Sequence, residues 1–329
     1  MCITVYHFTG LQGNCRFDFS HAVYLFYMIS GFVVMLSTET PEKKKRFLTR
    51  RLIRVLPLYW GLTFATFAAG LLRPDVIGYT PGADQLIKSL LFIPFDCATA
   101  KMGTAIRPLV GLGHTLQMEM LFYVFFLLAI HVSHRYRGFI AAALSALTAL
   151  AGAVFPTKNP VIHFYTANPY VWTSFIIGMA VYGGFFLLKK KEIRIPAKLP
   201  VSAPCVGVPL AIALPSLLRD MGVWYDIALF AVVLIAGLLW AACGKQTPRL
   251  LTKLGDISYS YYLLHYYVAA VAVRLLGIDS FSIRNVLLVI PASAAAWGIS
   301  WVSWYLIENK LSGLLQALLL KRPNKKETV

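Results

Sequence analysis

Acidic residues are scarce in this sequence, which has 14 Asp and Glu against 31 Lys and Arg, and a net charge of +17. Charged residues of both signs make up only 14% of the chain, whereas 58% is hydrophobic. The longest loop candidate, about 73–112, is broken by prolines and by an apolar patch, so no soluble domain is expected. The composition therefore predicts an all-α, polytopic integral membrane protein with a single domain over 1–329.

Metal-ligand spacing is also missing. The five cysteines are Cys2, Cys15, Cys97, Cys205 and Cys243, and none forms a metal-binding pattern with another. The sequence thus predicts no metal site. Cys15 and Cys97 both fall on the predicted outer face, where an oxidising compartment could join them, and two unpaired thiols are an equal alternative.

Two further absences narrow the function. The halves of the chain show no matched pair of Gly- or Pro-broken helices, which a transporter with a midplane site would have. No basic stripe is interleaved with aromatic residues on a soluble domain, so nucleic acid is not an expected partner. The first absence weakens a transporter interpretation, and the second weakens a nucleic-acid interpretation.

Apolar runs predict nine complete membrane helices, each of about 17–23 residues, as roughly 30 Å of hydrocarbon requires. They lie at 21–38, 56–72, 113–131, 138–155, 169–188, 201–218, 225–243, 257–277 and 285–307. A further stretch, at 1–11, has only about half the necessary length. We expect about ten transmembrane helices, the first one truncated, and a native start about fifteen to twenty residues before Met1.

Most of the basic residues gather on one predicted face. Of the 31 Lys and Arg, 22 lie in alternate loops and in the C-terminal tail. By the positive-inside rule this face is cytoplasmic, so both termini of the full-length protein, including the basic tail within 311–329, are expected in the cytoplasm. The basic excess then reflects topology, with membrane lipid as its partner.

Two ionisable side chains inside apolar segments are the first catalytic candidates. His7 places an imidazole, which titrates near neutrality, in the first apolar stretch. Glu119 lies one to two turns into a predicted helix, where an isolated carboxylate would cost several kcal/mol. A histidine or arginine of another helix is its expected partner, and we predict that His7 or His114 pairs with it. The alternative interpretations are a buried structural histidine and a structural ion pair.

Arg51 and Arg54 are candidates for binding a cytoplasmic ligand that carries phosphate. Residues three apart share a face of a helix and can hold an anionic group from two sides. The alternative interpretation is a topological anchor, with Tyr59 and Trp60 at the membrane interface.

Four residues are accessory candidates: His114, Tyr123, Tyr261 and His265. His114 and Tyr123 lie in the same stretch as Glu119. Asp256 is predicted to cap a helix in which Tyr261 and His265, four apart, share a face. For His265, packing is the favoured interpretation over catalysis.

Five short phrases follow one another along the chain. They are FYMISGF at Phe26–Phe32, the RxxR of Arg51 and Arg54 running into RVLPLYW at Arg54–Trp60, GHTLQMEMLFY at Gly113–Tyr123, SYSYYLLH at Ser258–His265, and IEN at Ile307–Asn309. In this order and spacing they resemble membrane acyltransferase family 3, especially its exopolysaccharide-production branch, over nearly the whole chain.

The resemblance implies a membrane acyltransferase of the bacterial inner membrane. Such an enzyme moves an acyl group, usually acetyl, from cytoplasmic acyl-CoA to a sugar hydroxyl of a surface polysaccharide or polyprenyl-linked precursor. Acyl-CoA is a co-substrate, and no permanently bound cofactor is expected. His7 takes the place of the family histidine that activates the hydroxyl or relays the acyl group, and Arg51 and Arg54 take that of the pair associated with CoA.

Two departures from the family pattern stand out. The family arginine eleven positions before His7 would precede Met1, and His114 stands where the family usually has Trp. Glu119 could orient the histidine, as an acid does in a catalytic triad. A transporter or flippase of a lipid-linked sugar is the alternative function, and a non-catalytic membrane scaffold is a third.

Overall fold

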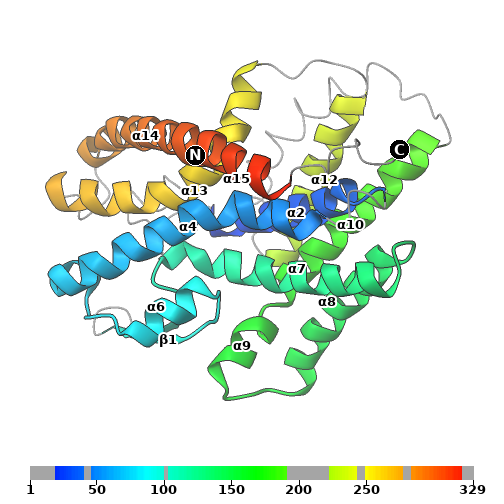
Figure 1. Cartoon of the computed structure of the whole chain (residues 1–329), viewed down its shortest axis with the longest axis horizontal. Coiled ribbons are helices and arrows are strands. Elements are labelled where there is room, and N and C mark those ends of the chain that lie inside the picture. Colours follow the sequence, from blue (N-terminus) through cyan, green and yellow to red (C-terminus); the bar gives the residue numbers. More distant parts are fainter. Residues whose placement is uncertain are drawn as a thin grey trace, which may run out of the picture.

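A computed structural model of the chain describes residues 19–40, 46–99, 103–190, 222–242, 249–276 and 283–320 (Figure 1). The long helices are α2 (Val23–Ser37), α4 (Phe47–Leu72), α7 (His114–Val132), α8 (Arg137–Val154), α10 (Pro169–Lys190), α12 (Gly222–Ala242), α13 (Arg249–Leu276) and α14 (Ile283–Ser303). The short elements are η1 (Phe19–Ala22), α5 (Pro74–Ile77), α6 (Ala83–Leu90), η2 (Gly111–Gly113), α9 (Pro160–Thr166), η4 (Trp304–Leu311), α15 (Ser312–Leu319), and the strands β1 (Asp96–Thr99) and β2 (Gly103–Ile106).

The helices confirm a polytopic membrane protein. Five of the described helices are long and apolar enough to cross a membrane, namely α4, η2 with α7, α8, α10 and α12, and α2 is a shorter apolar helix. Eight of the ten predicted segments fall on described helices. The segments at 1–11 and 201–218 lie outside the described residues. That α13 and α14 also cross the membrane stays a prediction.

Two helices begin earlier than the hydropathy indicates. Helix α4 starts at Phe47 rather than near 56, and α13 starts at Arg249 rather than near 257. Arginine is a good helix former, and its long side chain reaches water from a turn beyond the apolar segment, so the helix continues past the membrane. Asp256 therefore lies inside α13, and the prediction that it caps the helix is wrong.

Helix α2 lies in the middle of the molecule and packs on α10, α12 and α7 (Figure 1). Its approach to α10 is the closest, because Gly31 faces the backbone of Phe175 while Gly178 faces the carbonyl of Met28. A Cβ at either glycine would overlap these backbone atoms. Small residues allow such crossings in membrane helices. Around the crossing, Phe122 of α7 stacks on Phe175 with ring centroids 3.9 Å apart.

The bundle has two distinct ends. We call the end at which α2 finishes and α4 and α8 begin the basic end. There, Arg137 donates from Nε to the Thr38 hydroxyl oxygen at 3.0 Å, so α2 and α8 meet at this end. Ser312 Oγ donates to the Ile53 carbonyl oxygen at 3.0 Å and joins α15 to the same end of α4.

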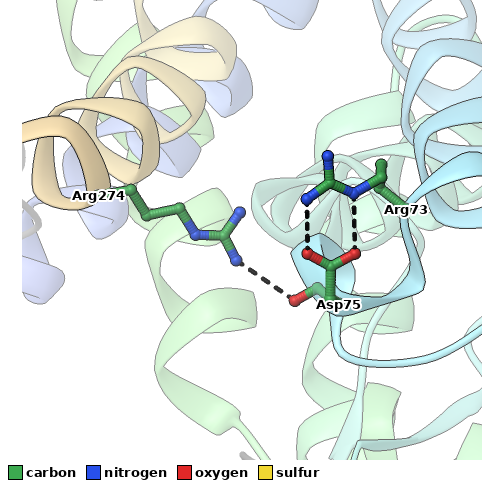
Figure 2. A network of polar contacts seen from close by, with 3 residues as sticks. All are labelled: Arg73, Asp75 and Arg274. Carbon is green, nitrogen blue, oxygen red and sulfur yellow. Dashed lines mark hydrogen bonds and ion pairs between the residues drawn. The ribbon is translucent and has the colours of Figure 1, made fainter.

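At the opposite end, Arg73 and Asp75, which follow α4, form a two-bond ion pair at 3.1 Å. Arg274, near the end of α13, donates to the Asp75 carbonyl oxygen at 3.4 Å (Figure 2). Helices α4 and α13 therefore end on the same side. We call this side the hairpin end, because it also carries the β1–β2 pair.

The hairpin is the one strand pair among the described residues, and the apolar pattern does not predict it. Strand β1 pairs antiparallel with β2, with Asp96 opposite Ile106 and Thr99 opposite Gly103. Helix α9 contacts β2. Hairpin and α9 thus stand over the starts of α7 and α10. Cys97 lies on β1, and Cys15, with which it could form a disulfide, lies outside the described residues. The pairing of these two cysteines therefore stays a prediction.

Candidate active site

A cavity of about 380 Å³ opens at the basic end, between the first turns of α4 and the η4–α15 segment. Arg50, Arg51 and Arg54 of α4 line it, with Asp256 of α13 and Glu308 of η4. Arg51 and Arg54 thus face one space, as their spacing predicts. Three guanidinium groups against two carboxylates favour an anionic ligand, and guanidinium geometry suits phosphate oxygens.

Arg51 is held in place between this cavity and the interior of the bundle. It is half-buried, and its Nη2 donates to the Ser37 hydroxyl oxygen at 3.3 Å. Its guanidinium lies 6.0 Å from the Phe47 ring centroid and 5.9 Å from the Tyr123 ring centroid, within cation–π range. Arg54, in contrast, is exposed to the cavity.

Glu308 is the less obvious carboxylate of this cavity. It sits in the π-helix η4, a wider winding that is frequent at functional sites. Its Oε1 accepts from the Ser260 backbone N–H at 3.0 Å and from the Ser260 hydroxyl at 2.6 Å. Glu308 lies beyond α14, and burial raises the pKa of its carboxyl, although these bonds and the Arg54 charge oppose the shift.

Glu119 lies deep in the bundle, on α7, with only 3% of its surface exposed. Its Oε1 accepts two hydrogen bonds of 2.6 Å, one from the Ser30 hydroxyl of α2 and one from the Tyr123 hydroxyl one turn along α7. Charged acceptors make short, strong hydrogen bonds. We call Ser30, Glu119 and Tyr123 the central cluster.

Two histidines, His7 and His114, are the expected partners of Glu119. His114, on the same helix, is exposed, and its Nδ1 lies 2.9 Å from the Gly111 carbonyl oxygen. Residues five apart point to different sides of a helix, so within the described part of the chain a His114–Glu119 pair does not form. The prediction that His7 or His114 pairs with Glu119 therefore rests on His7, which lies outside the described residues, and stays a prediction.

A second cavity, of about 550 Å³, opens at the hairpin end. Its walls come from the starts of α2, α7 and α10, from α9, and from the hairpin. The polar and aromatic lining residues include Tyr24, Tyr27, Asp96, His114, His163 and Asn168. Two cavities therefore enter the bundle from opposite ends.

Each cavity has a lining residue that adjoins the central cluster, although Ser30, Glu119 and Tyr123 are not among the described lining residues of either cavity. Arg51 lines the basic-end cavity, and its guanidinium lies over the ring of Tyr123, whose hydroxyl binds Glu119. Met118, the neighbour of Glu119 in the chain, lines the hairpin-end cavity. The central cluster therefore adjoins one lining residue of each cavity.

Tyr261 and His265 lie elsewhere. Their rings stack 5.6 Å apart, and Tyr261 stacks on Trp297 of α14 at 4.4 Å. His265 is 1% exposed, and its Nδ1 lies 2.9 Å from the Tyr261 carbonyl oxygen. Among the described lining residues of the two cavities neither side chain occurs. The geometry favours their packing role between α13 and α14.

Comparison with known proteins agrees with these features. An acyltransferase-domain family model, that of acyltransferase family 3, matches residues 3–305. The chain belongs to this acyltransferase 3 family. It is also 28% identical over 281 residues to the exopolysaccharide production protein ExoZ of Rhizobium meliloti (strain 1021), covering 82% of this chain and 80% of that protein. No solved structure matches the chain.

Sequence reasoning about this acyltransferase 3 protein did not single out Ser30, Asp256 or Glu308 as site residues. Ser30 and Glu308 lie in the phrases that resemble the family, which was the available signal. For Asp256, the signal was that acidic residues are rare beside the predicted membrane segments. Asn168 and His163 carry no motif, and only the fold brings them to a cavity.

Proposed function

We propose that this protein transfers an acyl group, most simply acetyl, from cytoplasmic acyl-CoA to a hydroxyl of a surface polysaccharide or its lipid-linked precursor. The observation that carries the proposal is the arginine-lined cavity whose Arg51 lies over the ring of Tyr123, a hydrogen-bond partner of the buried Glu119. An anionic donor bound there would place its acyl end toward a carboxylate already held by two hydroxyl groups.

The basic end is the cytoplasmic side in this proposal. Its loops carry most of the basic residues, and acyl-CoA is a cytoplasmic metabolite with several phosphate oxygens. Arg51 and Arg54 bind those phosphates, Arg51 as a fixed group and Arg54 as an exposed one. The acceptor enters from the hairpin end, on the outer face of the bacterial inner membrane.

The reaction breaks the thioester C–S bond and forms an ester between the acyl carbon and a sugar oxygen. The sugar hydroxyl loses its proton, and the leaving CoA thiolate takes up a proton. His7 is the proposed base or acyl relay, by its place in the family. Glu119 orients the reacting histidine or stabilises its protonated form. Ser30 and Tyr123 hold the Glu119 carboxylate in one position.

Mass spectrometry of surface glycans tests the proposal, with and without this gene. We expect an acyl mass difference that returns with the wild-type gene and does not return with His7→Ala, although the variant inserts normally. Loss of a catalytic base typically costs at least about 10²-fold in rate. Identical glycans in the two strains would contradict the proposal, and sugar transport without acyl-CoA consumption would favour the flippase.

The donor site has its own test. Changing both Arg51 and Arg54 to Lys keeps the topological charge and removes the planar forks, so the KM for acyl-CoA should rise by about tenfold or more. Arg135→Lys is the matched control, because this exposed arginine lies at the same end and outside the described lining of the cavity. An unchanged KM in the double variant would leave both arginines as anchors.

A further inference from the structure

The hairpin-end cavity combines rigid walls with hydrogen-bonding groups from separate elements. Its volume of about 550 Å³ is within the roughly 300–1,000 Å³ of small-molecule sites. Asp96 comes from β1, His114 from α7, His163 from α9 and Asn168 from the turn before α10. Four segments far apart in the sequence thus place polar side chains around one space.

Helix α9, which supplies His163, is fixed from three directions. The Asn159 side chain caps it by accepting from the N–H groups of Val161 and Ile162 at 3.0 and 3.1 Å. The Tyr165 hydroxyl donates to the Phe92 carbonyl oxygen at 3.2 Å, and burial raises the pKa of Tyr165 to about 12, so the donor keeps its proton. His163 is therefore presented by a supported wall and is exposed.

Trp172 supplies the third support, since its Nε1 donates to the Tyr165 carbonyl oxygen at 2.7 Å. Next to this support, the Asn168 Oδ1 is buried and has no hydrogen-bond partner among the described residues. A buried acceptor without a partner costs free energy, and a ligand that donates to it would remove that cost. Asn168 thus points to an occupant that carries donor groups.

The lining also indicates the charge of the occupant. Its described lining residues include Asp96 and no Lys or Arg, so a carboxylate or phosphate on the ligand would meet a like charge at Asp96. Arg107, which follows the lining residue Ile106 in the chain, is not among these lining residues. Hydroxyl groups, in contrast, can donate to Asp96 and Asn168 and can bond to the two imidazoles. Tyr24 and Tyr27 add aromatic surface.

We propose that this cavity is the acceptor site and that it selects a neutral saccharide over an acidic one through Asp96, His163 and Asn168. The assignment rests on the proposed acyl transfer for its role as acceptor site, but the binding itself does not. Tyr27, 2% exposed, and Met118 line the cavity from α2 and α7, the helices that also carry Ser30 and Glu119.

Saturation-transfer NMR on the full-length protein in lipid nanodiscs tests binding without need of activity. The probes are methyl β-glucoside and methyl β-glucuronide, which differ by one carboxylate. We expect the glucoside to bind at least about tenfold more tightly than the glucuronide, since one unpaired charge is worth at least that factor. Asp96→Asn should narrow this ratio.

Two further variants locate the site. Asn168→Ala and His163→Gln should each weaken glucoside binding by about fivefold to tenfold, the effect of one lost hydrogen bond. His131→Gln is the control, because His131 lies at the other end of α7. Its Nδ1 is 2.8 Å from the Leu127 carbonyl oxygen of the same helix.

Each outcome decides one claim. Equal or tighter binding of the glucuronide, no glucoside binding, or unchanged binding in both Asn168→Ala and His163→Gln would overturn the assigned site, even if the protein consumes acetyl-CoA. Selective glucoside binding with the expected variant effects supports the site. If acetyl-CoA is then not consumed with any envelope glycan, the proposed acyl transfer fails while the saccharide site stands.

Discussion

The crossing of α2 and α10 yields a prediction about stability. An added methyl group should have opposite effects on stability at two glycines of the same helix. A Cβ at Gly178 would lie more than 1 Å inside the 3.4 Å of ordinary contact with the Met28 carbonyl oxygen. The obstacle is backbone, so the two helices must separate. At Gly184, on the same helix, a Cβ meets nothing within 4 Å.

The magnitudes follow from overpacking and helix propensity. Overpacking typically costs about 1–3 kcal/mol, whereas Gly→Ala in an unobstructed helix gains about 0.5–1 kcal/mol. At roughly 2 °C per kcal/mol for a chain of this size, Gly178→Ala should lower the midpoint of thermal unfolding by about 2–6 °C. Gly184→Ala should leave the midpoint unchanged or raise it slightly.

Fluorescence-detected thermal unfolding of the purified protein in one detergent compares the two variants. Acyl transfer by Gly178→Ala should also fall, because α2 carries Ser30 of the central cluster. Equal midpoints for the two variants would refute the claim that this crossing depends on bare backbone contact. A double variant of Gly31 and Gly178 to Ala should be no more stable than Gly178→Ala.

Three further predictions concern the carboxylates and the buried histidine. Glu119→Gln should lower the rate of acyl transfer by tenfold or more with little loss of expression, since loss of a charge-assisted hydrogen bond is worth about 1.5–3 kcal/mol. Tyr123→Phe should lower the rate by less than Glu119→Gln does. The measurement is the steady-state rate per folded protein, and a wild-type rate in Glu119→Gln would show that the charge of Glu119 has no role in the reaction. Ser260→Ala removes a bond that holds the Glu308 pKa down, so this raised pKa should rise further and the loss of stability should grow as pH increases through it; a deficit independent of pH would contradict this. His265→Gln should destabilise the protein yet leave the rate per folded molecule and its pH profile unchanged, and a shifted pH profile would return His265 to the catalytic candidates.

The membrane helices could be predicted because hydrocarbon imposes a length and an apolar composition on each one. Their ends could not, as α13 shows: the apolar pattern begins near 257, but the backbone is helical from Arg249. Hydropathy reports where lipid contacts begin, whereas helix winding continues as long as side chains such as that of Arg249 reach water.

The site could be predicted only where its residues fall close together in sequence. Arg51 and Arg54 share a cavity because three positions on a helix suffice to place them. Glu119 was found because a carboxylate in an apolar run needs a partner, but its partner Ser30 lies 89 positions away and a serine in a membrane helix is unremarkable by itself. Pairings over such distances depend on helix packing, which a single sequence does not specify.

The two cavities on either side of Glu119 also shape the electric field within the protein. Water that enters both cavities brings each bulk solution inward, so the membrane potential falls mainly across the protein layer between them. A charge that crosses the full potential changes its energy by about 2.3 kcal/mol per 100 mV. A neutral acyl group crossing this layer does no electrical work, whereas a proton would. The rate of acyl transfer should therefore be insensitive to voltage as long as the proton of the acceptor hydroxyl remains on its own side.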